Sequence, residues 1–384
     1  MPLALSGPAL HPVTESSSTP FIGRISECPD LPEVLRAHAI LRIAQCPDAV
    51  PRGFRAYLID SAPANLPVRD AFILAPAFRY LADGDIVRLD ADRRTIATLY
   101  RKASPSNSFL VTERCDNRCL MCSQPPAAGD ATGLVEELRE VIPLVDPATK
   151  EIGITGGEPA LLGDDLIILL DMMKRDLPRT AVHILSNGRR FSDPGLARAL
   201  GSVEHPDLMV GVPLHSDLPE EHDYVAQCRG AFDEAVRGIL NLKRAGLRVE
   251  VRFVIHAQTN ARLPAFAAFM ARNLRFVDHV ALMGIELVGF ALTNLDLLWI
   301  DPADYQTKLA HAVSNLRRAG MSTSIYNLPL CILPPELHGL ARKSISDWKN
   351  IYCDECGPCL RRNACCGFFA SESIRRPRGI RAFT

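Results

Sequence analysis

The feature that most constrains the fold is a regular alternation of short apolar runs and longer amphipathic stretches, which begins near residue 107. Stretches with helical periodicity, among them 163–177, 231–246 and 263–274, separate several of the runs. Strands that alternate with helices predict a parallel sheet with right-handed crossovers. We therefore expect an α/β fold, a partial (β/α)6 barrel, with strands in 108–112, 151–157, 180–188, 207–215, 248–256 and 278–287.

Two further segments flank this barrel, which we place at residues 106–320. Residues 1–105 are rich in proline, and residues 84–102 alternate around a turn-like "DAD", which predicts a β-hairpin. We expect this N-terminal region to be β-rich and to cap the barrel or bind a peptide. Residues 321–384 form a C-terminal segment in which cysteines gather.

Bulk composition excludes some classes of partner. The chain of 384 residues has 43 basic and 44 acidic side chains, so no overall field attracts nucleic acid or an anionic membrane. We find no run of about 18 apolar residues and no signal-peptide pattern at the start, and we expect a cytoplasmic protein. Disulfides are rare in that compartment, so 12 cysteines indicate metal or redox chemistry.

Three of the cysteines share one loop. Cys115, Cys119 and Cys122 form C-x3-C-x2-C directly after the first predicted strand, at the strand end where such folds carry their chemistry. Polar neighbours argue against three buried core thiols. A structural zinc site needs four ligands, and no fourth cysteine or histidine is near in sequence. A 4Fe-4S cluster held by three thiolates leaves one iron open to another ligand, and we favour this interpretation.

The next strand ends in a glycine loop. Gly156 and Gly157 are followed by Glu158 and Pro159. An ordinary glycine turn is the alternative to a binding site here. Glycines let a ligand approach the backbone closely, and a carboxylate beside them can pair with an ammonium group. We therefore count these four residues as candidate cofactor contacts.

Three later strands supply weaker candidates. Ser186 and Asn187 end one strand and offer a hydroxyl and an amide for a ribose or a carboxylate, although a simple Asn-Gly turn competes. His215 and Ser216 follow the next strand, where a structural histidine is the commoner case. Arg252 lies on the strand after that and points either into the barrel, towards a carboxylate, or to solvent.

A second cysteine group lies near the end of the chain. Its core reads C-x2-C-x5-C, and four thiolates from this region would saturate zinc or a second 4Fe-4S cluster, between which spacing does not decide. Buried free thiols are the alternative. The cysteines are Cys331, Cys353, Cys356, Cys359, Cys365 and Cys366.

The cysteine loop followed by "GGEP" and "LSNG" resembles the signature of the radical S-adenosylmethionine (radical SAM) enzymes. In that family the open iron chelates the amino and carboxylate groups of the cofactor's methionine, and the reduced cluster cleaves it to a 5'-deoxyadenosyl radical. The resemblance implies a radical SAM barrel, a 4Fe-4S cluster and S-adenosyl-L-methionine, with Glu158 near the amino group. Met121 replaces the aromatic residue that usually precedes the third cysteine.

The C-terminal spacing resembles the auxiliary-cluster segments of radical enzymes that modify peptides. In those segments an upstream cysteine completes the ligand set. The resemblance implies a second 4Fe-4S cluster held by Cys356, Cys359, Cys365 and an upstream cysteine, for which Cys331 is our choice. Cys353 and Cys366 are the alternatives.

Residues 111–126, 284–302 and 330–371 together resemble the HxsC family of radical SAM maturases from His-Xaa-Ser systems. This resemblance implies a precursor peptide or protein with His-Xaa-Ser repeats, a companion radical SAM enzyme, and an electron donor such as flavodoxin or ferredoxin. Two other functions stay open, a radical enzyme for a small metabolite and a non-catalytic electron-transfer protein. The open iron beside "GGEP" disfavours the second, because an electron carrier needs no exchangeable iron.

Overall fold

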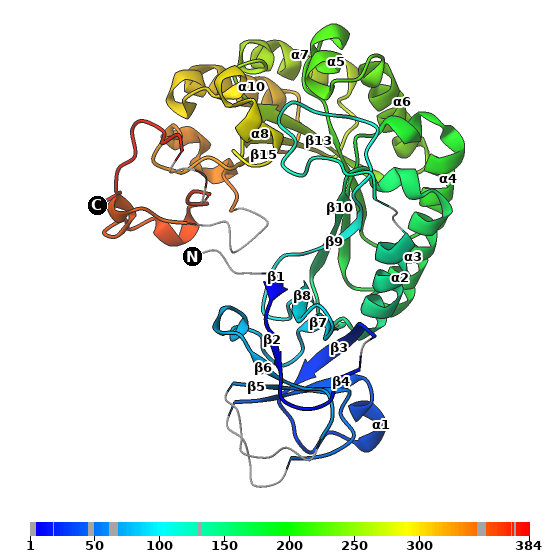
Figure 1. Cartoon of the computed structure of the whole chain (residues 1–384). Helices are drawn as coiled ribbons and strands as arrows, with labels where there is room; N and C mark the ends of the chain where they lie inside the picture. Colours follow the sequence, from blue (N-terminus) through cyan, green and yellow to red (C-terminus); the bar gives the residue numbers. More distant parts are fainter. Residues whose placement is uncertain are drawn as a thin grey trace.

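The computed structural model describes residues 5–17, 19–44, 50–60, 68–129, 132–343, 351–369, 371 and 374–384. It contains two β-sheets that follow one another along the chain (Figure 1). The first sheet uses residues 6–100 and the second uses residues 107–326. The predicted boundary at residue 105 falls in the connection between the two sheets.

The first sheet closes on itself. Its order is β1-β8-β7-β3-β4-β5-β6-β2, and only Ala9 separates β1 from β2 although they pair with opposite ends of that order. One short segment therefore pairs with the strands at both edges of the sheet, as closure of a barrel requires. The strands are β1 (Ser6–Pro8), β2 (Leu10–Pro12), β3 (Phe21–Ser26), β4 (Ala39–Ile43), β5 (Ala56–Ile59), β6 (Ala71–Leu74), β7 (Ile86–Asp90) and β8 (Thr95–Tyr100), with α1 (Glu33–Arg36) and η1 (Pro76–Phe78) between them.

The predicted hairpin is confirmed, because β7 and β8 pair antiparallel with Leu89 opposite Ile96. The inside of this small barrel is apolar and includes Leu10, Ile25, Leu58 and Phe72. Alternation around a tight turn identified this hairpin since both of its strands are local in sequence. Closure by β1 and β2 depends on pairs far apart in the chain.

The second sheet is the predicted α/β partial barrel. All its strands are parallel, and each pairs with its neighbours in sequence, so β9 and β15 form the two ends of the strand order. The seventh strand, β15, was not predicted and lies beyond the expected end of the barrel at residue 320. The strands are β9 (Asn107–Thr112), β10 (Glu151–Gly156), β11 (Ala181–Leu185), β12 (Leu208–Pro213), β13 (Arg248–Ile255), β14 (His279–Gly284) and β15 (Thr323–Tyr326).

Helices cover the convex side of this sheet (Figure 1). Alternate strand residues such as Ile154, Val182 and Val251 face them in one continuous core. The concave side carries more polar positions. The helices are α2 (Thr132–Val141), α3 (Asp164–Asp176), α4 (Pro194–Ser202), α5 (Pro219–Ala226), α6 (Ala231–Arg244), α7 (Leu263–Asn273), α8 (Phe290–Thr293), α9 (Leu295–Leu298) and α10 (Gln306–Arg318).

Short 3-10 turns join or follow these elements. They are η2 (Ile142–Leu144), η3 (Pro159–Leu162), η4 (Arg189–Ser192), η5 (Asn260–Arg262), η6 (Pro302–Tyr305), η7 (Pro335–Leu340), η9 (Asp354–Cys356) and η10 (Arg362–Ala364). Within the described residues, no helix has the length and apolar character needed to cross a membrane.

Polar contacts join the first barrel to the α/β barrel. The Tyr100 hydroxyl lies 2.7 Å from the Thr149 hydroxyl. Lys102 pairs with Asp146 at 3.3 Å, and Arg88 pairs with Glu137 on α2. These contacts lie at the end of the sheet opposite to the cysteine loop, so the N-terminal barrel packs at that opposite end (Figure 1).

Helix α6 rests directly on the turn after β11. A Cβ atom on Gly238 would lie 2.1 Å from the backbone oxygen of Gly188, which is far inside any allowed contact. We expect Gly238→Ala to lower the free energy of unfolding by about 2 kcal/mol or more, since the backbone must shift. Gly133→Ala on α2, where a Cβ meets nothing within 4 Å, is the matched control and should be neutral or slightly stabilising. Equal losses in urea unfolding would contradict this close packing.

Candidate active site

The three-cysteine loop begins where β9 ends. Cys115, Cys119 and Cys122 are all partly buried, and none is in a disulfide. Burial, with smaller effects from the neighbouring thiols and carboxylates, raises the pKa of Cys115 to about 11 and that of Cys119 to about 12. A soft metal centre that needs thiolates would displace these protons on binding. Three thiols on one loop fit an iron-sulfur cluster by donor chemistry.

The glycine pair at the end of β10 supports this loop. A Cβ atom on Gly156 (φ +150°) would lie 2.2 Å from the oxygen of Thr112, and one on Gly157 would lie 2.1 Å from the oxygen of Arg114. The amides of Gly157 and Glu158 donate to those same two oxygens at 2.8 and 2.7 Å. Glycine is therefore required at both positions because the backbone of the cysteine loop packs against them. The sequence did not indicate this packing. A ligand contact at Gly156, Gly157 or Pro159 stays a prediction.

Glu158 lies entirely inside the protein and is 0% exposed. Its Oε1 accepts from the Ser186 hydroxyl at 2.6 Å and from the Ala160 amide at 2.9 Å, and its Oε2 accepts from the Asn187 amide at 2.5 Å. Desolvation raises the pKa of Glu158 to about 7. The structure thus brings together Glu158, Ser186 and Asn187, three predicted site residues, by joining the ends of β10 and β11. Pairing of this carboxylate with an ammonium group stays a prediction.

The third cysteine is fixed from the opposite side by residues 285–299. The Phe290 amide donates to the Cys122 oxygen at 2.8 Å, and a Cβ atom on Gly289 (φ +60°) would lie 2.5 Å from that oxygen. Met121 is buried in a small apolar cluster with Val225, Ala291 and Leu298. The apolar residue before the third cysteine therefore anchors the loop to α5 and to α8 and α9.

His215 and Ser216 form the turn between β12 and α5. The His215 ring stacks on His222 with centroids 5.0 Å apart, and its amide donates to Nδ1 of His222 at 3.1 Å. The Ser216 hydroxyl donates to Glu221 at 2.8 Å. Both residues are nearly inaccessible to solvent, at 3% and 1% exposure. These contacts are structural, and a role in cofactor binding stays a prediction for both.

Arg252 meets a carboxylate on its own strand. Its Nε lies 3.5 Å from Oε1 of Glu250, and its Nη2 donates to the Met283 sulfur at 3.3 Å. His183 and His279 also approach Glu250, at 3.7 and 3.9 Å. Sequence reasoning missed this polar group on the concave face because its members come from three strands. The sequence offered one signal for this group. Glu250 and Arg252 are two residues apart in β13, and side chains two apart on a strand lie on the same face.

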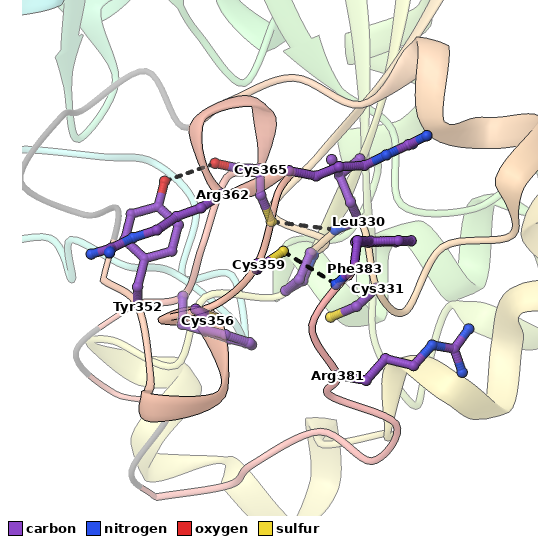
Figure 2. Close-up of a pocket in the computed structure, with 12 residues that line it drawn as sticks. Leu330, Cys331, Tyr352, Cys356, Cys359, Arg362, Cys365, Arg381 and Phe383 are labelled. Atoms are coloured by element: carbon purple, nitrogen blue, oxygen red, sulfur yellow. Dashed lines mark hydrogen bonds between the residues drawn. The ribbon is translucent and has the colours of Figure 1, made fainter.

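Four of the C-terminal cysteines line one pocket (Figure 2). Cys331, Cys356, Cys359 and Cys365 line it, with aromatic and arginine side chains that include Tyr352, Arg381 and Phe383. Backbone amides already donate to two of the sulfurs, Phe383 to Cys359 at 3.5 Å and Leu330 to Cys365 at 3.4 Å. The four thiols predicted as one ligand set therefore share one pocket.

The two alternative cysteines do not line this pocket, although each lies beside a cysteine that does. Cys353 does not line the pocket, and its sulfur is 3.5 Å from that of Cys356. Cys366 also does not line it, and its thiol donates to the Gly367 oxygen at 3.3 Å. A hydrogen bond with Cys366 lowers the pKa of Cys365 to about 6. Within the described residues, no three His, Cys, Asp or Glu side chains are arranged so that they could hold a metal ion. Both ligand sets are therefore proposals.

Buried histidines beside the strand ends predict a pH dependence of stability. Burial lowers the pKa of His222 and of His256 to about 4. Between pH 6.5 and about 4 the unfolded chain therefore binds protons that the folded chain does not, so stability is lost as the pH falls through this window. For one such histidine the loss is about 3 kcal/mol.

His256→Asn tests this dependence, because the Asn oxygen can replace Nδ1 as acceptor for the Gln258 amide. We expect the variant to lose about 3 kcal/mol less than the wild type between neutral pH and about pH 4. Urea unfolding at a series of pH values measures the difference. Parallel curves for the two proteins would show that His256 does not titrate in this window.

Comparisons with known proteins agree with the site. Residues 109–270 match the model of the Radical SAM superfamily. Curated relatives include the Fe-coproporphyrin III synthase of Methanosarcina barkeri, 26% identical over 40% of this chain and 38% of that protein. The PqqA peptide cyclase of Granulibacter bethesdensis is 24% identical over 53% of this chain and 52% of that protein. The GTP 3',8-cyclase of Petrotoga mobilis is 25% identical over 38% of this chain and 45% of that protein.

Solved structures that are similar to part of the chain include the following two. One is Streptococcus suis SuiB bound to S-adenosylmethionine, with a TM-score of 0.44, 15% identity, and 57% and 49% of the two chains covered. The other is anSMEcpe with bound AdoMet and a peptide, with a TM-score of 0.44, 14% identity, and coverage of 57% and 62%. The chain spans about half the length, or less, of the curated relatives described above. The match of residues 109–270 to the Radical SAM superfamily covers less than half of the chain and supports a radical SAM enzyme.

Proposed function

We propose that the chain is a radical SAM maturase that modifies a ribosomally made partner peptide or protein with His-Xaa-Ser repeats. The observation that carries this proposal is the loop of Cys115, Cys119 and Cys122, held by backbone hydrogen bonds at the strand ends of a region that matches the Radical SAM superfamily. Three thiols leave one iron of a 4Fe-4S cluster for the cofactor.

The chain's own residues have distinct roles in this proposal. Cys115, Cys119 and Cys122 would hold the cluster, which when bound would supply the one electron needed to cleave S-adenosyl-L-methionine to methionine and a 5'-deoxyadenosyl radical. Backbone contacts from β10 and residues 285–299 keep the three thiols at fixed spacing. The proposed cofactor contacts remain Gly156, Gly157, Glu158, Pro159, Ser186, Asn187, His215, Ser216 and Arg252.

We further propose a second 4Fe-4S cluster in the C-terminal pocket, with Cys331, Cys356, Cys359 and Cys365 as ligands. The pocket that these four cysteines share supports this set over one that includes Cys353 or Cys366, neither of which lines it. Zinc is the alternative metal, since four thiolates suit both.

A peptide substrate has support from one curated relative, which is named a PqqA peptide cyclase. The GTP 3',8-cyclases among the relatives favour a small-molecule substrate as the second candidate. A companion radical SAM enzyme, an electron donor such as flavodoxin or ferredoxin, and a cytoplasmic location complete the proposal. The deciding experiment is the mass change of a His-Xaa-Ser peptide after anaerobic incubation with reduced protein and S-adenosylmethionine, with GTP as the competing substrate.

Replacing Cys115, Cys119 and Cys122 together by Ala should abolish formation of 5'-deoxyadenosine, because no iron is then held at the loop. The reconstituted wild type should contain about eight irons per chain and the triple variant about half as many. Cys28→Ala, at an exposed cysteine of the N-terminal barrel, is the control and should change neither quantity. Cofactor cleavage by the triple variant would refute the proposed function.

Replacing Cys356 and Cys359 by Ala should leave uncoupled formation of 5'-deoxyadenosine while peptide modification disappears. A cluster ligated by four thiolates has no open iron for the cofactor, so its loss should not stop cleavage. Cys353→Ala should retain both clusters, since Cys353 does not line the pocket. Normal peptide modification by a soluble double variant would show that the second cluster is dispensable, and one zinc in the wild type would refute its identity.

A further inference from the structure

We propose that Arg189 is a positioning residue that directs hydrogen bonds at the cysteine thiolates and thereby raises the reduction potential of the cluster they hold. The inference rests on the proposed function, because it needs a cluster on that loop. Arg189 begins η4, directly after the strand end that carries Asn187. Nothing in the cysteine spacing points to it.

The Arg189 guanidinium is inserted between the cysteine loop and α6. Its Nη1 donates to the Asp116 backbone oxygen and to Oδ1 of Asn117, both at 2.8 Å. Its Nε donates to Glu234 on α6 at 2.6 Å, and the side chain is only 15% exposed. Because α6 is fixed against η4 by the contact between Gly238 and Gly188, this arrangement ties the first turn of the cysteine loop to a rigid helix.

The guanidinium decides which way the Asn117 amide points. A guanidinium can only donate, so Asn117 must present its oxygen to Arg189. The amide nitrogen then faces the other way, 3.9 Å from the Cys119 sulfur. The backbone amide of the same residue donates to the Cys115 sulfur at 3.4 Å. Asn117 is 5% exposed, so solvent has little access to these contacts.

Asn187 is oriented in the same manner. Its Oδ1 accepts from the backbone amide of Arg189 at 2.9 Å. Its Nδ2 therefore faces the loop, where it donates to Oδ1 of Asp116 at 2.6 Å and lies 4.0 Å from the Cys115 sulfur. Two side-chain amides and one backbone amide are thus directed at two of the three thiols.

Hydrogen bonds to cluster sulfurs favour the more negatively charged, reduced state and so raise the reduction potential. We expect Asn117→Ala and Arg189→Gln each to shift the midpoint potential to more negative values. Because Arg189 acts through Asn117, the double variant should shift no further than Asn117→Ala alone. A purely structural arginine would give additive shifts or none.

The experiment is a redox titration followed by electron paramagnetic resonance, together with the iron content of each reconstituted protein. The cluster on the loop is identified as the one whose signal changes when S-adenosylmethionine is added. Arg190→Gln, at the exposed neighbouring arginine, is the matched control and should leave the potential unchanged. Circular dichroism confirms that each variant is folded.

The outcomes are distinct. An unchanged potential in iron-loaded Asn117→Ala, or additive shifts in the double variant, overturns the inference and leaves the proposed function standing. Loss of loop iron from Arg189→Gln, with normal loading of Arg190→Gln, supports the positioning of the loop by Arg189, and Asn117→Ala then tests the hydrogen bond to sulfur. A wild type without any signal that responds to S-adenosylmethionine overturns the proposed function as well.

Discussion

The close approach of two backbone segments, the end of β10 and the start of the cysteine loop, underlies the whole candidate site. Gly156 and Gly157 allow it because any Cβ atom there would overlap the oxygens of Thr112 and Arg114. The amides of residues 157 and 158 donate to those oxygens, so neither oxygen is left without a hydrogen bond. This contact places the Glu158 side chain in the interior, where its carboxylate accepts hydrogen bonds from Ser186 and Asn187 at the end of β11.

Further hydrogen bonds hold the cysteine loop on both sides of this contact. Asn187 reaches back to Asp116, and Arg189 links the same turn to Glu234 on α6. On the other side, Phe290 and Asn294 hold the oxygens of Cys122 and Leu120. The cysteine loop is thus bonded to elements on both sides of the strand ends, although it contains no helix or strand itself. Such over-determination is what a loop needs if it is to keep three thiols at constant spacing.

The C-terminal cysteines are held by a different kind of structure. Their pocket is lined by turns and by residues near the end of the chain, not by strands of the barrel. Aromatic and arginine side chains form much of its lining. Arg361 lies over the Phe383 ring at 5.1 Å, and Arg362 lies over Tyr352 at 4.8 Å. Arg378 binds Asp301, which returns the last residues of the chain to the barrel. A bound metal would add order to this region, as is usual for small sites without a large core.

The sequence alone determined the α/β class, the order of the strands and helices, and the two groups of cysteines, because these depend on periodicity and on spacing within short segments. It also indicated that Glu158, Ser186 and Asn187 lie at neighbouring strand ends, since parallel strands present their carboxyl ends at one edge. It did not reveal β15, a strand of four residues, or the closure of the first sheet by β1 and β2.

Only the tertiary structure decided what those residues touch. The glycine pair receives the cysteine loop, His215 stacks on His222, and Arg252 meets Glu250. The roles of Arg189 and Asn117 were equally hidden, because a hydrogen bond between residues 72 apart in the chain leaves no mark on local composition. Local patterns fix which elements form, whereas the orientation of a buried polar side chain is set by donors and acceptors that only folding brings together.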